Sequence, residues 1–60
     1  MQTAVIVEDE TLRKDTEKFY HLLTEKDGSL LGSTWADSKL GAYMVFSKEH
    51  SNYEIKIEKD

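Results

Sequence analysis

The sequence lacks cysteine and proline, and it has no long apolar run. Without cysteine the chain can form neither disulfides nor thiolate metal sites, so two common means of stabilising a small domain are excluded. No apolar run approaches the ~18 residues of a membrane-spanning helix. No linker-like, repetitive or low-complexity segment divides the chain, so we expect residues 1–60 to form a single small domain.

Basic side chains are also scarce, because 8 lysines and arginines face 12 aspartates and glutamates, for a net charge of −4. This balance disfavours direct binding to nucleic-acid phosphates. The densest acidic cluster is Glu8-Asp9-Glu10, directly after the apolar run at 4–7. The opening segment becomes acidic without a basic stretch, which is not typical of a signal peptide, so we expect a cytoplasmic location.

The first half of the sequence predicts a strand followed by a helix. The β-branched run at 4–7 is typical of a strand, and its lack of alternation suggests burial on both faces. Phe19, Leu22 and Leu23 have the spacing of one helix face. Asp15 is a suitable N-cap and Gly28 a suitable stop, so we expect a helix over about 15–26.

The second half predicts three strands, at 30–35, 42–46 and 53–57, with turns at 36–41 and 48–52. The expected fold is α+β with the order β-α-β-β-β, in which one helix packs on a small, mainly antiparallel sheet. The residues that we expect to be largely buried are Val5, Val7, Phe19, Leu22, Leu23, Val45 and Ile55.

The sequence offers little for catalysis. It has no phosphate-binding glycine loop, no nucleophile elbow and no zinc-protease motif. Glu8 and Glu10 are more simply explained as a solvated strand end than as an acid–base pair. We expect His21 on a helix surface, where it can pair with Glu17, and His50 in a turn. The chain is therefore expected not to be an enzyme, and to need no metal or cofactor.

The aromatic residues could stack nucleic-acid bases if they lie on strands, but the basic groove that such binding needs is missing. A small acidic domain can instead imitate the charge pattern of DNA and occupy the DNA-binding face of another protein. Ordinary surface charge for solubility explains the acidity equally well. Charge alone does not separate these two interpretations.

The chain resembles the phage-encoded uracil-DNA glycosylase inhibitors. Glu10-Thr11-Leu12 corresponds to the Glu-Ser-Ile motif that ends the first strand of that family. Residues 43–47, with Glu49, resemble a strand with the pattern Val-Met-Leu-Leu-Thr-x-Asp. Further similar positions are Glu17, Phe19, Leu22, Leu23, Thr34 and Asp37. Lys18 departs from the family's acidic residue, and the family's N-terminal helix and last strand have no counterpart.

The resemblance implies a DNA-mimic inhibitor that blocks the DNA-binding groove of uracil-DNA glycosylase from the host cytoplasm. It implies acceptors at Glu10 and Thr11, and an apolar pocket between helix and sheet that takes up an inserted side chain. The expected pocket residues are Phe19, Leu22, Leu23, Met44 and Phe46. The expected partner-binding residues are Glu8, Asp9, Glu10, Thr11, Leu12, Glu17, Phe19, Leu22, Leu23, Met44 and Phe46.

A closed core explains the same apolar residues without any pocket. The alternative function is therefore a regulatory interaction module without DNA mimicry, including a homodimer that uses its exposed sheet face. Low salt should strengthen binding by a DNA mimic, whose contacts are partly charge pairs, whereas apolar dimerisation should be nearly indifferent to salt.

Overall fold

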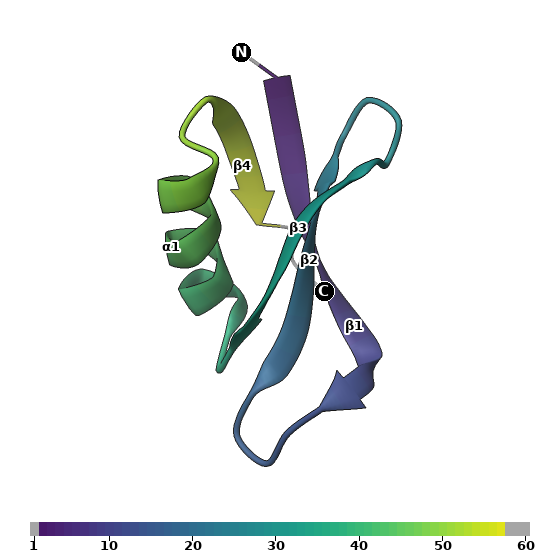
Figure 1. The fold of residues 1–60 in the computed structure, drawn as a ribbon, viewed down its shortest axis with the longest axis vertical. Helices are drawn as coiled ribbons and strands as arrows, with labels where there is room; N and C mark the ends of the chain where they lie inside the picture. The colour runs from purple at the N-terminus through teal and green to yellow at the C-terminus, as the bar shows by residue number, and fades with distance from the viewer. Residues whose placement is uncertain (1, 58–60) are drawn as a thin grey trace.

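A computed structural model describes residues 2–57 of the chain. Its one helix packs on a sheet of four strands, so the fold is α+β as expected (Figure 1). The order of the elements is β-β-β-α-β, with β1 at Gln2–Arg13, β2 at Lys18–Thr24, β3 at Leu30–Ala36, α1 at Lys39–Glu49 and β4 at Tyr53–Ile57.

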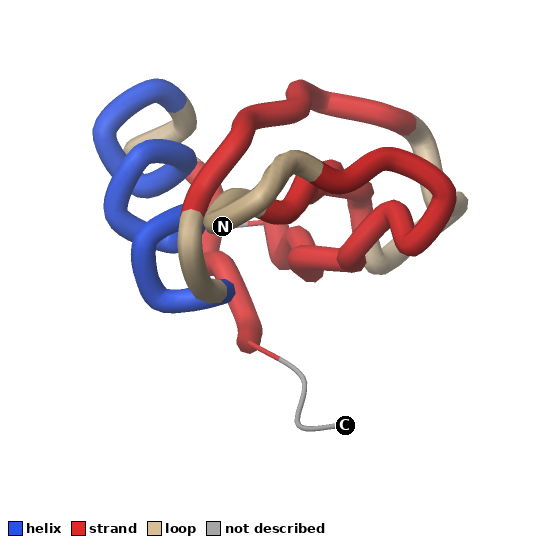
Figure 2. Tube along the Cα trace, turned by 90° about the horizontal axis from the view of Figure 1, so that it is seen from below, coloured by secondary structure: helices blue, strands red, loops and turns tan. Residues whose placement is uncertain are grey.

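The sheet has the strand order β3-β2-β1-β4. Two hairpins join β1 to β2 and β2 to β3, so both pairings are antiparallel. The chain then passes through α1 and returns as β4, which lies parallel to β1. Such a crossover is the usual way to add a parallel strand, because a tight turn can only reverse the chain. Figure 2 shows α1 to one side of the strongly twisted sheet, and no helix within residues 2–57 covers the sheet's other face.

The core lies between α1 and the facing side of the sheet. Ala42 and Phe46 of α1 are fully buried, and they are one helical turn apart. Alternate residues of β1 and β2 meet them because successive strand side chains point to opposite faces. The whole cluster is Ala4, Ile6, Tyr20, Leu22, Ala36, Ala42 and Phe46.

The helix expected over 15–26 is wrong, because this segment contains β2. The spacing of Phe19, Leu22 and Leu23 fits a helix face, but it also fits a strand with apolar residues on both sides. Pairing with β1 and β3 selects the strand, because it satisfies the backbone of β2 along both edges. Gly28 does take a positive φ of 73°, but it turns a hairpin rather than ending a helix.

The strand expected over 42–46 is also wrong, because these residues lie within α1. The apolar run there is continuous, and a short continuous run does not distinguish a buried strand from a helix. The side chain of Ser38 caps the helix by accepting a hydrogen bond from the Gly41 N–H at 3.2 Å. The turn expected over 36–41 therefore contains the start of α1, and the polar turn expected over 48–52 begins only after Glu49.

The strands at 30–35 and 53–57 are confirmed. The first strand is longer than expected, and it is buried on one face only, since Val7 is 40% exposed. Of the residues expected in the core, Leu22 is fully buried and Val45 is 38% exposed. The remaining four are partly buried: Val5, Phe19, Leu23 and Ile55.

Candidate functional site: the open face of the sheet

We call the side of the sheet that faces away from α1 the open face. Neighbouring strands bring its residues together in rows. One row joins Val5 to Leu23, and the next joins Val7 to His21. The alternation that buries Ala4, Ile6, Tyr20 and Leu22 under the helix directs the intervening side chains to the open face. These are Val5, Val7, Asp9, Phe19, His21, Leu23, Ser33 and Trp35.

Two aromatic rings form one end of the open face. Phe19 and Trp35 are cross-strand partners, and their ring centroids lie 4.8 Å apart with the planes tilted by 48°. The Lys14 ammonium lies 4.6 Å from the centroid of the Trp35 ring, within the range of a cation–π contact. Phe19 also meets the His21 ring edge-on at 5.0 Å. The aromatic end is therefore a partly exposed apolar surface that already accepts a cation.

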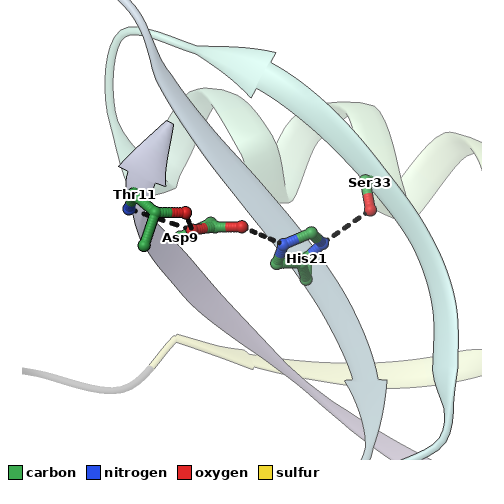
Figure 3. Close-up of polar contacts among 4 residues, drawn as sticks. All are labelled: Asp9, Thr11, His21 and Ser33. Carbon is green, nitrogen blue, oxygen red and sulfur yellow. Dashed lines mark hydrogen bonds and ion pairs between the residues drawn. The ribbon is translucent and has the colours of Figure 1, made fainter. Parts of the chain in front are cut away.

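A line of polar side chains crosses the open face from β1 to β3 (Figure 3). His21 lies in the middle, with its Nε2 atom 3.0 Å from Asp9 Oδ2 and its Nδ1 atom 2.7 Å from Ser33 Oγ. Thr11 donates both its backbone N–H and its hydroxyl to Asp9 Oδ1. We call Thr11, Asp9, His21 and Ser33 the polar track.

The electrostatics of the polar track centre on Asp9. The hydrogen bond from the Thr11 hydroxyl, followed by that from His21, lowers the pKa of Asp9 from 3.8 to about 2. Asp9 is therefore ionised at any ordinary pH. In the tautomer that donates Nε2–H to Asp9, the Nδ1 atom of His21 accepts a hydrogen bond from the Ser33 hydroxyl.

The polar track has the same sequence of groups as a serine-hydrolase triad: hydroxyl, imidazole and carboxylate. Hydrolysis also needs an enclosed substrate site and donors for the developing oxyanion. The polar track instead lies on an open sheet surface. A cavity of about 380 Å³ lies elsewhere, along α1. It is lined by Gly41, Met44, Val45, Lys48 and Glu49. The geometry therefore fits a cross-strand hydrogen-bond network better than a catalytic centre.

The acidic residues expected to bind a partner lie on the second half of β1. The carboxylate of Glu8 forms an ion pair with Arg13 at 3.2 Å, and Asp9 belongs to the polar track. Glu10, Thr11 and Leu12 are exposed, in the stretch where the pairing of β1 with β2 is interrupted. This bulge carries a compact group of acceptors, but their charge is partly offset by Arg13.

The expected apolar pocket residues do not share one surface. Leu22 and Phe46 are buried in the closed core, whereas Phe19 and Leu23 belong to the open face. Met44 is 58% exposed on the outer side of α1. The expectation of one pocket between helix and sheet fails because it took residues 15–26 as helix and 42–46 as strand. Glu17 lies in the β1–β2 turn, where its carbonyl accepts the Lys14 N–H at 3.0 Å.

Sequence reasoning did not select Trp35, Ser33 or His21 as site residues. His21 is not a helix-surface partner of Glu17, because it lies on β2 and bonds to Asp9. The alternation Phe19, His21, Leu23 is a period-two signal that could have found one edge of this surface. His50 does lie in a turn, as the C-cap of α1.

Residues 2–57 contain no group of three or more histidine, aspartate or glutamate side chains placed to hold a metal ion. In the same residues, no helix is long and apolar enough to cross a membrane. Comparison with known proteins finds no matching family model, no matching curated protein and no matching solved structure.

Proposed function

We propose that this chain is a non-catalytic protein-binding module that docks a basic partner protein through the open face. The observation that carries the proposal is the row-by-row register of Val5, Leu23 and Val7 beside the aromatic pair Phe19–Trp35. These side chains form two partly exposed apolar patches, one on each side of the polar track, on a sheet that has its helix on the other side. Surfaces of this kind are typical of protein interaction sites.

The charge of the chain favours a basic partner. The net charge is −4, and the exposed bulge of β1 presents Glu10 beside the open face. Lys14 on the Trp35 ring shows that a cation fits this aromatic end, so a lysine or arginine of the partner could take the same position. Opposite charge speeds association, and apolar contacts then lengthen the lifetime of the complex.

The specific partner that we propose is uracil-DNA glycosylase, a DNA-binding enzyme, on the basis of the resemblance at Glu10-Thr11-Leu12. In this proposal the exposed acceptors of the β1 bulge stand in for DNA phosphates. The apolar contact then comes from Phe19 and Leu23 on the open face, since Leu22 and Phe46 are closed in the core.

A uracil-excision assay with an equimolar amount of the chain tests this partner. We expect inhibition that weakens when salt is raised. Val7→Glu places a charge within the open face and should abolish inhibition, whereas Leu40→Glu makes the same change on α1, where Leu40 is 62% exposed, and should not. Glu10→Gln should weaken inhibition without affecting folding, because it removes only an exposed charge.

The outcomes test the choice of docking surface and the choice of partner protein independently. Equal inhibition by both glutamate variants would contradict docking through the open face. No inhibition by the unaltered chain would exclude this enzyme as the partner. With any enzyme that does bind, amide chemical-shift changes should map to the open face rather than to the outer side of α1.

A further inference from the structure

We propose that β3 is a pairing edge through which two copies of this chain form one continuous sheet, antiparallel about a two-fold axis beside Ser33. The strand order β3-β2-β1-β4 leaves β3 and β4 as the two edges among the described residues. An edge strand presents unpaired backbone donors and acceptors along its outer side, which form a template for another strand.

The two edges differ in how well they resist such pairing. β4 has five residues, and its alternate positions carry Glu54 and Lys56, whose charges discourage a second strand. β3 has seven residues, Leu-Leu-Gly-Ser-Thr-Trp-Ala, and none of them is charged. The structure therefore protects β4 with charge and leaves β3 without that protection.

A second copy is the occupant that fits this edge. Antiparallel pairing about Ser33 uses the regular stretch of β3 and brings the small residues Gly32, Ser33 and Thr34 of both copies together at the centre. Leu30, at the start of this edge strand, is 62% exposed. Two copies of net charge −4 repel over most of their surface, so they approach at least cost along a neutral strand. A basic partner gains no electrostatic attraction at this uncharged strand.

This pairing goes beyond the proposed docking function and does not depend on it. A two-fold axis perpendicular to the sheet keeps both open faces on the same side and brings the two Trp35 side chains towards the junction. The dimer would therefore present a doubled docking surface. Failure of the dimer leaves the open face of a single copy unchanged, so the two proposals fail separately.

The mass in solution, measured by sedimentation equilibrium from micromolar to millimolar concentration, tests the pairing. We expect the mass to rise from 6.9 kDa towards twice that value. Ser33→Lys sets two like charges opposite each other on the shared edge and should raise the dimer dissociation constant about tenfold or more. Ser33→Ala also loses the hydrogen bond to His21 but adds no charge, so it should still dimerise.

The matched control is Ser51→Lys, the same substitution in the exposed turn after α1, which should dimerise like the unaltered chain. A mass that stays at 6.9 kDa up to millimolar concentration would overturn the proposal. So would equal weakening by the two lysine variants, since general charge and not the edge would then be responsible.

A cross-link checks the register and covers the case in which Ser33→Lys does not fold. The chain has no cysteine, so Ser33→Cys introduces a single thiol. Residues directly opposite in an antiparallel pair have Cα atoms about 4.5–5.5 Å apart, within the range of a disulfide. We expect rapid oxidation to a covalent dimer for Ser33→Cys and slow oxidation for Ser51→Cys. Equal rates would overturn the pairing about Ser33.

Discussion

Asp9 and Thr11 form the tightest local contact of the polar track, and this contact lies on a bulge that sequence patterns do not reveal. Glu8, Asp9 and Glu10 look alike in the sequence, but they have different roles in the fold. Glu8 pairs with Arg13, Asp9 bonds to His21 and Thr11, and Glu10 is exposed. The acidic cluster could be predicted from sequence, whereas the division of roles depends on the strand pairing that brings His21 across from β1.

Acid should remove the stabilisation that Asp9 provides. Its pKa is lowered from 3.8 to about 2 in the fold, so the contribution is complete above pH 3.8 and is lost as the pH falls through about 2. The hydroxyl of Thr24 lowers the pKa of Asp27 in the same direction. We expect Asp9→Asn to be less stable than the unaltered chain at pH 6, with the difference shrinking towards pH 2. Urea unfolding at several pH values measures this, and a constant difference down to pH 2 would contradict it.

Adjacent leucines on opposite faces of β2 should respond differently to truncation. Leu22 is fully buried, so Leu22→Ala should lower the free energy of unfolding by about 2–5 kcal/mol. Leu23 is only partly buried on the open face, so Leu23→Ala should cost the fold less but should weaken partner binding. Denaturant titrations of both variants provide the comparison. A larger loss for Leu23 would contradict the assignment of faces.

At the scale of elements, the sequence predicts one helix and several strands, but it exchanges two of them: the segment predicted as the helix forms β2, and a segment predicted as a strand forms part of α1. The segments 18–24 and 39–49 both carry apolar residues on more than one side, so neither has a clear helical or strand period. The alternation of Tyr53, Ile55 and Ile57 is one-sided, and that strand is found where expected. Pairing between strands in the folded chain decides whether such an ambiguous segment becomes a helix or a strand. This pairing cannot be read from a single sequence.

The cap of α1 offers a test of what starts this helix. Ser38→Ala removes the acceptor for the Gly41 N–H, so we expect a loss of about 1 kcal/mol in the free energy of unfolding. Ser51→Ala, in the turn after α1, should stay within about 0.5 kcal/mol of the unaltered chain. Thermal or urea unfolding followed by circular dichroism compares them. Equal effects would show that the cap has no special role.

At the scale of the whole molecule, stability is limited by size. The fully packed cluster has seven residues, and no disulfide supports it. We expect a free energy of unfolding of only a few kcal/mol for the isolated chain. The melting temperature should rise with protein concentration if copies pair, and with any partner that binds only the folded chain. An isolated chain that survives high guanidinium concentration would contradict this expectation.

The crossover through α1 also determines the order in which the fold can be completed during synthesis. β1 leaves the ribosome before the other described strands, yet its parallel neighbour, Tyr53–Ile57, is the last described element of the chain. The antiparallel meander of β1, β2 and β3 can form early from local contacts, whereas the pairing of Gln2 with Tyr53 spans almost the whole sequence. Until then one edge of β1 stays accessible to chaperones or to other nascent chains. Of the described strands, the one that is made earliest is therefore the last to gain its second neighbour.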